Sequence, residues 1–407
     1  MKILVLNAGS SSIKYRLFDM PRATVLGRGL AERIGQSDAV LHYRAKGSPV
    51  VITQAIPEPE RGYTSALRAI IAMLTDKKVG CIKAVMDVEA VGHRVVHGGE
   101  DFTQTTRITP EVKEAIRRLF TLAPLHNPAN LEGIETAELL FPHAEQVAVF
   151  DTAFHQTMPP VAYRMALPDR VYRDEGIRAF GFHGISHQFV AAEAKRLMKR
   201  KTDRMITVHL GNGCSMAAIK EGVVVDTSMG LGPLGGLVMG TRAGDVDPSA
   251  LLHLMRQCGY SPDDMYTMLN KESGLLGLSG HSDMRDVKKA MLSGDPKAQL
   301  AYDIYAYRIQ KYIGAFVAVL GGLDALVFTA GVGENDALLR HMVCERLHCF
   351  SVDIDVMRNS KKVQKPLVIS SSKSKVRVMM IPTNEELEIA RQAAHLLGVR
   401  THYSKNG

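Results

Sequence analysis

Short segments of alternating apolar and polar residues open the chain and predict β-strands. Residues Ile13–Phe18 alternate as in a strand with one buried face, and Ile3–Leu6 before them is an uninterrupted apolar strand. Residues Asn7–Ser11 are rich in Asn, Gly and Ser and predict a turn between these strands. Further strands are expected at Thr24–Leu30 and Val40–Arg44. The opening segment is therefore predicted to be a β-hairpin followed by more strands.

Strand-like and helix-like segments alternate up to about residue 150. Helices are predicted at Tyr63–Leu74 and Pro110–Leu122, and strands at Ala90–Val96 and Val147–Phe150. This alternation is typical of an α/β domain.

A second cycle of the same kind begins near residue 206. Apolar residues Ile206–Leu210 precede the turn Gly211–Ser215, and strands are predicted at Met216–Ile219 and Val223–Val225. The order of strand, Gly/Asn/Ser turn and strand repeats the arrangement around Asn7. We interpret it as an internal repeat, which predicts two α/β domains packed about a cleft.

The rest of the chain completes the second domain. Helices are predicted at Pro248–Arg256, Pro262–Leu269, Pro296–Leu320, Asn335–Leu347 and Asn384–Leu397, and strands at Ala325–Phe328 and Val376–Ile381. The expected domains are residues 1–151 with 387–407, closed by the C-terminal helix, and residues 152–386.

Composition fits an enzyme of the cytoplasm. The chain has 407 residues, of which 46% are hydrophobic, and this is more than one hydrophobic core usually fills. No apolar run approaches the roughly 20 residues of a membrane span, and the N-terminus lacks the pattern of a signal peptide. The five cysteines are odd in number and scattered, which favours free thiols in a reducing compartment.

The formal net charge of +8 could attract nucleic acid, a membrane surface or small anions. The densest basic cluster, Lys195–Arg204, is interpreted as the solvated end of a helix and the loop after it. An enzyme with small anionic substrates is the simpler interpretation, and neither a nucleic acid nor a membrane is expected as a partner.

Two common nucleotide-binding classes are excluded by their motifs. The chain contains neither the Gly-x-x-x-x-Gly-Lys-Ser/Thr run of P-loop proteins nor the protein-kinase signature set. Residues Gly230–Gly235 match Gly-x-Gly-x-x-Gly, but a dinucleotide site needs a helix to begin there. Three more glycines follow closely, at Gly236, Gly240 and Gly244, and such density argues against a helix.

Three other turns are suited to anions. Residues Asn7–Ser12 offer successive backbone N–H groups and hydroxyls with Lys14 close behind, and His209–Gly213 is similar. Residues Thr329–Asn335 follow a buried strand and precede a predicted helix, where the helix dipole favours phosphate. Two hairpins in repeated positions and one strand–Gly–helix turn together favour a phosphate ligand.

Nine motifs spread over nearly the whole chain can be considered together: Asn7–Lys14, Gly92–Gly99, Ala123–Asn127, Val149–His155, Gly181–Gly184, His209–Gly213, Met239–Arg242, Glu272–Gly277 and Pro382–Glu386. In this order they resemble the motifs of the acetate and propionate kinase family, which belongs to the actin, sugar-kinase and chaperone ATPase group. The resemblance implies a duplicated actin-like (ribonuclease H-like) α/β fold, with two domains around a nucleotide cleft.

The resemblance also implies roles for four catalytic residues. Arg94 would hold the carboxylate and Arg242 the transferring phosphoryl group, since a planar guanidinium donates bidentately to both. His183 would donate to the phosphoryl oxygens, with His126 and His209 as weaker candidates near the same site. Asp151, at the end of an apolar strand, would be the catalytic aspartate.

The implied nucleotide and metal ligands come from both halves of the chain. Lys14 would meet a phosphate. The other implied nucleotide-binding residues are His209, Leu210, Gly211, Asn212, Gly213, Asp283, Met284, Arg285, Gly331, Val332, Gly333, Glu334 and Asn335. Asn7 and Glu385 match the family's Mg²⁺-linked positions, and Mg²⁺ is usually held by one or two protein oxygens with phosphates and waters.

An apolar pocket for the acyl group would consist of Val96, Leu125, Phe182 and Pro233. Propionate-preferring relatives tend to have alanine where Val96 stands, so Val96 favours acetate without excluding propionate. The sequence departs from the family in residues 230–236, where glycines replace a threonine and a glutamate, and at Ala243 and His281, which replace serines.

The resemblance therefore implies a reversible, Mg²⁺-dependent acetate kinase, which transfers the γ-phosphoryl group of ATP to acetate in line, giving acetyl phosphate and ADP. It further implies a homodimer through the second domain. Two alternatives stay open at this point: a propionate or other short-chain fatty acid kinase, and an actin- or chaperone-like ATPase.

Overall fold

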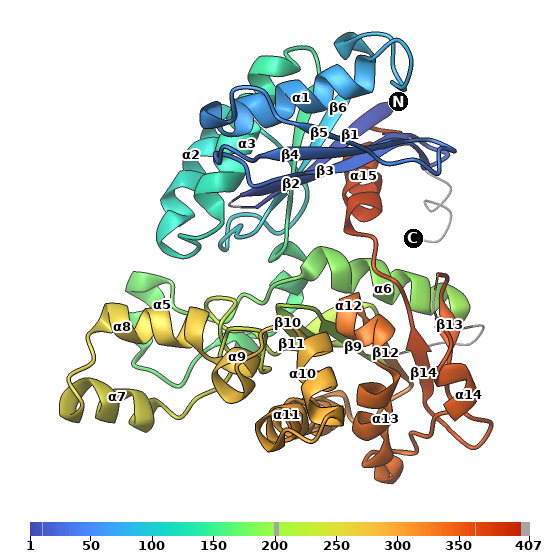
Figure 1. The fold of residues 1–407 in the computed structure, drawn as a ribbon. Coiled ribbons are helices and arrows are strands. Elements are labelled where there is room, and N and C mark those ends of the chain that lie inside the picture. The colour runs from blue at the N-terminus through green and yellow to red at the C-terminus, as the bar shows by residue number, and fades with distance from the viewer. Residues whose placement is uncertain (10, 199–202, 363, 400–407) are drawn as a thin grey trace. The chain divides into compact units, whose positions relative to one another are not determined.

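The computed structural model describes residues 1–9, 11–198, 203–362 and 364–399, and the chain forms two compact units. The first unit is Met1–Ala153 with Asn384–Gly407, and the second unit is Phe154–Thr383. Each contains one β-sheet with helices packed on it (Figure 1). Of the cluster Lys195–Arg204, residues 199–202 lie outside the described part of the chain, as does Ser10 of the opening turn.

The sheet of the first unit has eight strands in the order β5-β4-β3-β2-β1-β6-β8-β7. Their bounds are β1 Lys2–Gly9, β2 Ser12–Asp19, β3 Thr24–Glu32, β4 Val40–Ala45, β5 Ile52–Ala55, β6 Ala90–Val95, β7 Thr106–Arg107 and β8 Glu145–Phe150. Strand β1 is antiparallel to β2 and parallel to β6, which is parallel to β8.

The sheet of the second unit repeats this pattern with six strands, in the order β11-β10-β9-β12-β14-β13. Their bounds are β9 Arg204–Leu210, β10 Cys214–Lys220, β11 Val223–Thr227, β12 Ala325–Thr329, β13 Leu367–Val368 and β14 Arg377–Met380. Strand β9 is antiparallel to β10 and parallel to β12, which is parallel to β14. The order and directions of β3-β2-β1-β6-β8 thus recur in β11-β10-β9-β12-β14, which confirms the predicted duplication.

Helices cover both sheets. In the first unit they are α1 Tyr63–Thr75, α2 Pro110–Arg118, α3 Asn127–Leu140 and α15 Glu385–Leu396. In the second unit they are α4 Pro160–Tyr163, α5 Asp169–Glu175, α6 Gly184–Leu197, α7 Pro248–Gln257, α8 Pro262–Thr267, α9 Gly274–Ser279, α10 Met284–Leu292, α11 Pro296–Leu320, α12 Ala330–Asn335, α13 Ala337–Glu345 and α14 Val356–Asn359.

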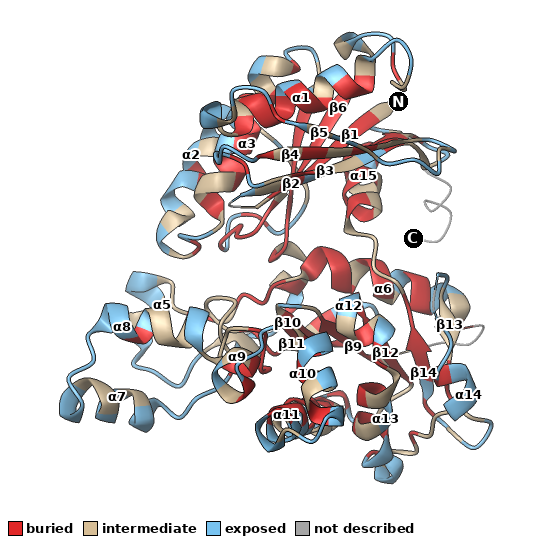
Figure 2. Ribbon diagram, in the orientation of Figure 1, coloured by how far each residue is buried: buried red, intermediate tan, exposed pale blue. Residues whose placement is uncertain are grey.

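The core of each unit lies between its sheet and these helices. All five residues of β12 are buried, and so are the last five of β8 (Figure 2). Helix α15 approaches β6 closely, because a β-carbon added at Gly92 would lie 2.8 Å from the Ile389 side chain. A glycine at this position of β6 therefore lets the C-terminal helix close the first unit.

The long, strongly patterned elements agree with the sequence predictions, and Pro296–Leu320 matches α11 at both ends. The single helix predicted over Asn335–Leu347 is wrong, because the chain leaves helical geometry at Asp336, which caps α13 by accepting from Leu339 N–H. The predicted helices Pro110–Leu122 and Pro262–Leu269 are too long, since α2 gives way to a 3₁₀ turn and α8 to a π-helical turn. Helices α3, α5, α6, α9 and α10 were not predicted from the pattern.

Candidate active site

Three predicted site residues lie where β1, β6 and β8 end. These strands are parallel, so their carboxyl ends share one edge of the sheet, which is where α/β proteins bind ligands. Asn7 lies near the end of β1, Arg94 near the end of β6, and Asp151 directly after β8. Asn7 is a strand residue paired with Lys14, so the predicted turn is shorter than Asn7–Ser11.

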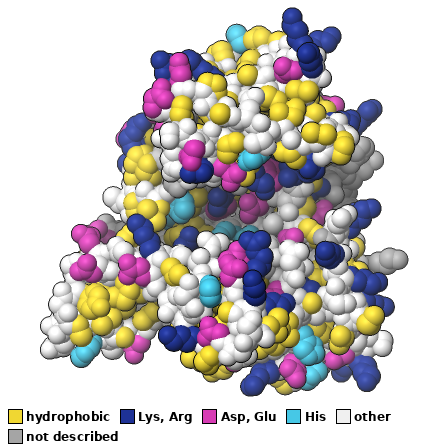
Figure 3. Space-filling view, viewed as in Figure 1, with side chains coloured by type: hydrophobic (Ala, Val, Ile, Leu, Met, Phe, Trp, Pro, Cys, Tyr) yellow, Lys and Arg dark blue, Asp and Glu magenta, His cyan; other side chains and the backbone are white. Residues whose placement is uncertain are grey.

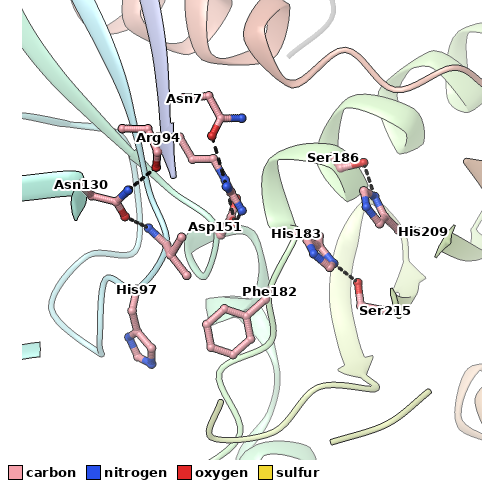
Figure 4. A network of polar contacts seen from close by, with 12 residues as sticks. Asn7, Arg94, His97, Asn130, Asp151, Phe182, His183, Ser186, His209 and Ser215 are labelled. Carbon is pink, nitrogen blue, oxygen red and sulfur yellow. Dashed lines mark hydrogen bonds and ion pairs between the residues drawn. The ribbon is translucent and has the colours of Figure 1, made fainter. Parts of the chain in front are cut away.

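Arg94 connects these three residues (Figure 4). Its Nε and Nη2 donate to Asp151 Oδ2 at 3.0 and 2.5 Å, and its Nη1 donates to Asn7 Oδ1 at 3.2 Å. Burial alone would lower the pKa of Arg94, but the Asp151 and Glu385 carboxylates outweigh it and raise that pKa. Arg94 therefore carries a fixed positive charge, as a residue that binds an anion requires.

Helix α3 fixes the loop that follows β6. Asn130 accepts from Val96 N–H at 3.0 Å and donates to Ala8 C=O at 2.8 Å (Figure 4). Asn127 bonds both the N–H and the C=O of His97 at 3.1 and 3.0 Å. Two buried amides thus determine where the backbone around Val96 lies relative to the end of β1. The sequence reasoning missed both, although Asn127 stands within the family motif Ala123–Asn127.

Acidic residues at the start of α15 complete the polar group of the first unit. Glu386 is buried and pairs with Lys14 Nζ at 2.5 Å and Arg16 Nη2 at 3.5 Å. Burial raises the pKa of Glu386, but Lys14 and Arg16 more than compensate, and it is lowered. Glu385, the predicted metal ligand, begins the helix as expected. Lys14 pairs with a carboxylate that the sequence reasoning did not single out, and its contact with a phosphate stays a prediction.

In the second unit, His183 lies in a group of imidazoles and hydroxyls. His183 Nδ1 lies 2.8 Å from Ser215 Oγ, and its ring stacks on His209 with centroids 4.3 Å apart (Figure 4). His209 Nδ1 lies 2.8 Å from Ser186 Oγ. The backbone of His183 is left-handed, with φ at 57°, where non-glycine residues are uncommon and cluster at functional sites. This group supports the predicted importance of His183.

The Gly213 turn lies between His183 and Arg242. A β-carbon at Gly213 would be 3.4 Å from His183 Nε2 and 3.6 Å from Arg242 Nη1. Arg242 Nη1 also donates to Pro233 C=O at 2.9 Å. Gly240 allows a second close approach, because a β-carbon there would lie 2.0 Å from Asn212 Oδ1. The predicted phosphoryl ligands of the second unit are thus neighbours around a turn without side-chain bulk.

The predicted turn Thr329–Asn335 lies beside the Gly213 turn, because Thr329 pairs with His209 across β12 and β9. Helix α12 begins at Ala330, whose φ is 63°, so this segment opens a helix directly after the buried strand β12, as expected. Glu334 accepts from Thr383 N–H at 3.0 Å, and burial raises its pKa. A β-carbon at Gly331 would meet nothing within 4 Å.

The remaining predicted nucleotide residues begin α10. Asp283 caps this helix and pairs with the exposed side chain of Arg285 at 2.5 Å. The hydrogen bonds from Arg285 lower the pKa of Asp283 to about 2. Met284, the first residue of α10, is buried. A β-carbon at Gly240 would lie 2.8 Å from Ser282 C=O, which brings this segment near the Asn212 turn.

The four predicted acyl-pocket residues differ in burial. Val96 and Phe182 are 4% and 2% exposed, whereas Leu125 is 46% exposed and Pro233 is half-buried. Val96 and Leu125 belong to the first unit, and Phe182 and Pro233 to the second. The pocket therefore stays a prediction.

The glycine-rich segment 230–236 forms turns, and the next helix begins only at Pro248, so the dinucleotide motif does not initiate a helix. Gly236 has φ at 92°, and a β-carbon there would lie 2.4 Å from Ser228 C=O, so this glycine is required. Gly232 and Gly235, which replace larger residues of the family, have room for side chains.

Charge and metal-ligand patterns add little beyond this site. On the face drawn in Figure 3, basic side chains of the described residues are interspersed with acidic ones. Within the described ranges, no three His, Cys, Asp or Glu side chains converge as a metal-holding group, and no helix there combines the length and apolarity needed to span a bilayer. The assignment of Asn7 and Glu385 as Mg²⁺ ligands stays a prediction; Mg²⁺ is usually held by one or two protein oxygens, with phosphates and waters in the rest of its shell.

Two sheets with the same strand order, each with polar residues at the carboxyl ends of its parallel strands, define a duplicated α/β fold. The chain belongs to the acetokinase family, whose sequence profile matches residues 2–391. An acetate kinase of Thermotoga petrophila is 48% identical over 402 residues, which cover 98% of this chain and 99% of the relative.

Two solved structures are similar over nearly the whole chain. The acetate kinase of Porphyromonas gingivalis has a TM-score of 0.90 at 45% identity, and the match covers 97% of this chain and 99% of that one. A propionate kinase of Francisella tularensis has a TM-score of 0.89 at 40% identity, with coverage of 96% and 98%. The predicted fold and family are therefore confirmed.

Proposed function

We propose that this protein is an acetate kinase, which transfers the γ-phosphoryl group of ATP reversibly to acetate and gives acetyl phosphate and ADP. The observation that carries the proposal is the Arg94–Asp151 pair beside Asn7 at the carboxyl ends of β1, β6 and β8. Arg94 is the carboxylate ligand: its charge is held by Asp151, and Val96 follows it on a loop fixed by α3.

Phosphoryl transfer depends mainly on positioning and on neutralising charge. Arg242 and His183 supply donors to the transferring group from around the Gly213 turn, whose lack of side chain lets an anion approach both. The nucleotide phosphates lie on the His209–Gly213 turn, and the adenosine lies against Asp283–Arg285 and Gly331–Asn335. In-line transfer requires no covalent intermediate on the protein.

Mg²⁺ is the expected cofactor, held by Asn7 and Glu385. When bound, it neutralises charge on the nucleotide phosphates. Glu385 contributes to raising the pKa of Arg94, so its charge is felt at the carboxylate site. Glu386, one residue further on, is committed to Lys14 and Arg16 and does not bind the metal.

Propionate is the second candidate substrate, because a propionate kinase shares this fold at 40% identity. Val96 argues for acetate, since a smaller residue there would leave room for a methylene. One methylene is worth about 1–3 kcal/mol in a hydrophobic pocket, so propionate is a poorer substrate that is still accepted. An actin- or chaperone-like ATPase would need no carboxylate clamp, and Arg94 argues against it.

The proposal is tested by mixing the purified protein with ATP, Mg²⁺ and acetate, and trapping acetyl phosphate as its hydroxamate while ADP is measured. Acetate-dependent formation of both products in equal amounts is expected. ADP release that is the same with acetate, propionate, butyrate or no acid would contradict the kinase function.

Cellular setting and assembly complete the proposal. We place the enzyme in the cytoplasm as a homodimer, with neither nucleic acid nor membrane as a partner. All five cysteines are free thiols, which fits a reducing compartment. Sedimentation at micromolar concentration would reveal the dimer, and a mass of one chain would contradict it.

A further inference from the structure

The hydroxyl of Ser215 contacts two histidine rings at once. Its Oγ lies 2.8 Å from His183 Nδ1 and 2.8 Å from His187 Nε2. The other nitrogen of His187, Nδ1, lies 2.7 Å from Thr207 Oγ1. A continuous chain of hydrogen bonds therefore runs from Thr207 through His187 and Ser215 to His183. Ser215, His187 and Thr207 are all fully buried.

His187 is held neutral. Burial lowers its pKa well below 6.5, and the neighbouring rings of His155 and His209 lower it further. His155 is itself neutral near pH 7, because burial lowers its pKa to about 4. A neutral imidazole has one N–H donor and one acceptor nitrogen, and a hydroxyl has one proton. Ser215 Oγ can accept two hydrogen bonds but has only one proton to donate, so its bond with His183 Nδ1 runs in one of two directions.

In the first direction Thr207 donates to His187, His187 donates to Ser215, and Ser215 donates to His183 Nδ1. The proton of neutral His183 is then on Nε2. In the second direction His183 Nδ1 keeps its proton and donates to Ser215, and Nε2 carries a lone pair. That nitrogen is the one that faces the Gly213 turn and Arg242.

The second direction could present a donor at Nε2 only if His183 were charged. The cationic Arg242, which lies across the Gly213 turn, opposes a positive charge on His183, whose ring stacks on His209 from β9. A neutral His183 that donates from Nε2 avoids placing two cations side by side. A phosphoryl oxygen at the turn therefore favours the first direction.

We propose that Ser215, oriented by His187 and Thr207, is a positioning residue that fixes the Nε2–H tautomer of His183, so that a neutral imidazole donates to the transferring phosphoryl group. This inference rests on the proposed function. It adds the residues that set the proton position, none of which touches the substrate.

The test combines Ser215→Ala with His183→Ala in a double-mutant cycle on the full-length enzyme. Acetyl phosphate formation is followed at saturating ATP, Mg²⁺ and acetate. If Ser215 acts through His183, Ser215→Ala lowers kcat about tenfold in the parent and less than twofold when His183 is already alanine. The KM for acetate should stay within twofold in each variant. An equal loss in both backgrounds, or no loss in the parent, would overturn the inference.

A second pair of variants tests the hydrogen bond between Thr207 and His187, at the far end of the chain from His183. Thr207→Val removes the donor to His187, and kcat should fall about threefold, whereas Thr207→Ser keeps the hydroxyl and should restore the parent rate. Equal rates in these two variants would count against the relay. Circular dichroism melting curves check that all the variants fold.

Nitrogen NMR of the protein labelled at histidine separates this inference from the function itself. Neutral His183 should carry its proton on Nε2 in the parent, and Ser215→Ala should shift its Nδ1 resonance. A parent with the proton on Nδ1 would overturn the inference even if acetyl phosphate is made. A parent that makes no acetyl phosphate ends the proposed function, and the NMR result still decides the tautomer.

Discussion

The strand ends of the two sheets can be compared position by position, because the sheets share their order and directions. Strand β1 pairs with β6 from Ile3 and Ala90 onward, and β9 pairs with β12 from Met205 and Ala325 onward. Counted from these pairs and their neighbours, Asn7 corresponds to His209, Lys14 to Ser215, Arg94 to Thr329 and Asp151 to Thr383.

The matched positions carry different chemistry. In the first sheet two of them are ionised partners, Arg94 and Asp151, and Lys14 pairs with Glu386. In the second sheet the same places hold an imidazole and hydroxyls, and Ser186 links His209 to Thr383 at 2.8 Å on each side. Duplication thus supplies two equivalent edges, one with ionised side chains and the other with an imidazole and hydroxyls, and this difference fits the proposed division between carboxylate binding and phosphate binding.

The largest effect is expected from removing Arg242, which we propose as the cation that binds the transferring phosphoryl group in the second unit. Arg242→Ala should lower kcat about 1000-fold, because a donor aimed at transition-state charge is lost. The KM for acetate should change less than threefold, since the carboxylate ligand belongs to the first unit. Arg256→Ala, which removes an exposed arginine of α7, is the control. A large rise in the KM for acetate with unchanged kcat would contradict the comparison, because Arg242 would then bind acetate and not the transferring phosphoryl group.

The neutral imidazoles of the second unit should make it sensitive to acid. Burial lowers the pKa of His155 to about 4, and that of His187 well below 6.5, whereas the first unit has His93 with a pKa of about 4. Below pH 6.5 the unfolded chain binds more protons, so stability is full above pH 6.5 and is lost as pH falls towards 4. For His155 and for His93, this loss of stability is on the order of 3 kcal/mol each at pH 4.

Urea unfolding of the parent, His155→Gln and His93→Gln at pH 7 and pH 4.5 measures this sensitivity. Each variant should lose less free energy of unfolding between the two pH values than the parent does. Identical losses in all three proteins would show that these buried histidines do not set the acid limit.

Two neighbouring glutamates at the start of α15, Glu385 and Glu386, are expected to have different roles in the first unit. Glu385→Gln should raise the Mg²⁺ concentration for half-maximal activity about tenfold, as changes around metal sites do. Glu386→Gln should instead lower the melting temperature, because it leaves Arg16 and Lys14 without their buried partner. Titration of Mg²⁺ and thermal melting distinguish the two variants. A weaker Mg²⁺ response in Glu386→Gln together with a lower melting temperature in Glu385→Gln would contradict the two assignments.

The smallest expected effect concerns acyl size. Val96→Ala should raise the ratio of kcat/KM for propionate to that for acetate about tenfold, the value of one methylene in a pocket. Ile108→Val, which trims a partly buried residue elsewhere in the first unit, is the control. A parent that already prefers propionate tenfold would contradict the assignment of Val96.

The sequence predicted elements with strong periodicity and the residues within motifs. Helix α11 was predicted to the residue, and the repeat around Asn7 and His209 correctly indicated the duplicated fold. Helix α6 was missed because it begins at Gly184 after a left-handed His183 and has no Ser, Thr, Asp or Asn cap. Helix α3 was missed because its buried face is not uniformly apolar: it includes Asn127, Asn130 and Thr136, so apolar residues do not recur at helical spacing along it.

The polar partners of the site residues could not be predicted from the sequence, for a different reason. Glu386 meets Lys14, and Asn130 meets Ala8, only because distant segments are brought together by the sheet and by α15. No local pattern records such contacts. Glu386 at least stood beside a predicted ligand in the same motif, whereas Ser215 and His187 gave no signal apart from their places next to the His209–Gly213 turn and the His183 motif.

The division between the two sheets is tested most directly in Arg94→Ala, by measuring acetate-dependent turnover and the affinity for ADP in the same preparation. Removing the carboxylate ligand should lower kcat/KM for acetate about 1000-fold and leave the ADP dissociation constant within twofold of the parent. The control Arg28→Ala, which removes an exposed arginine, should leave both quantities within twofold of the parent. Near-normal turnover, or a loss of ADP binding of comparable size in a folded Arg94→Ala protein, would contradict the account.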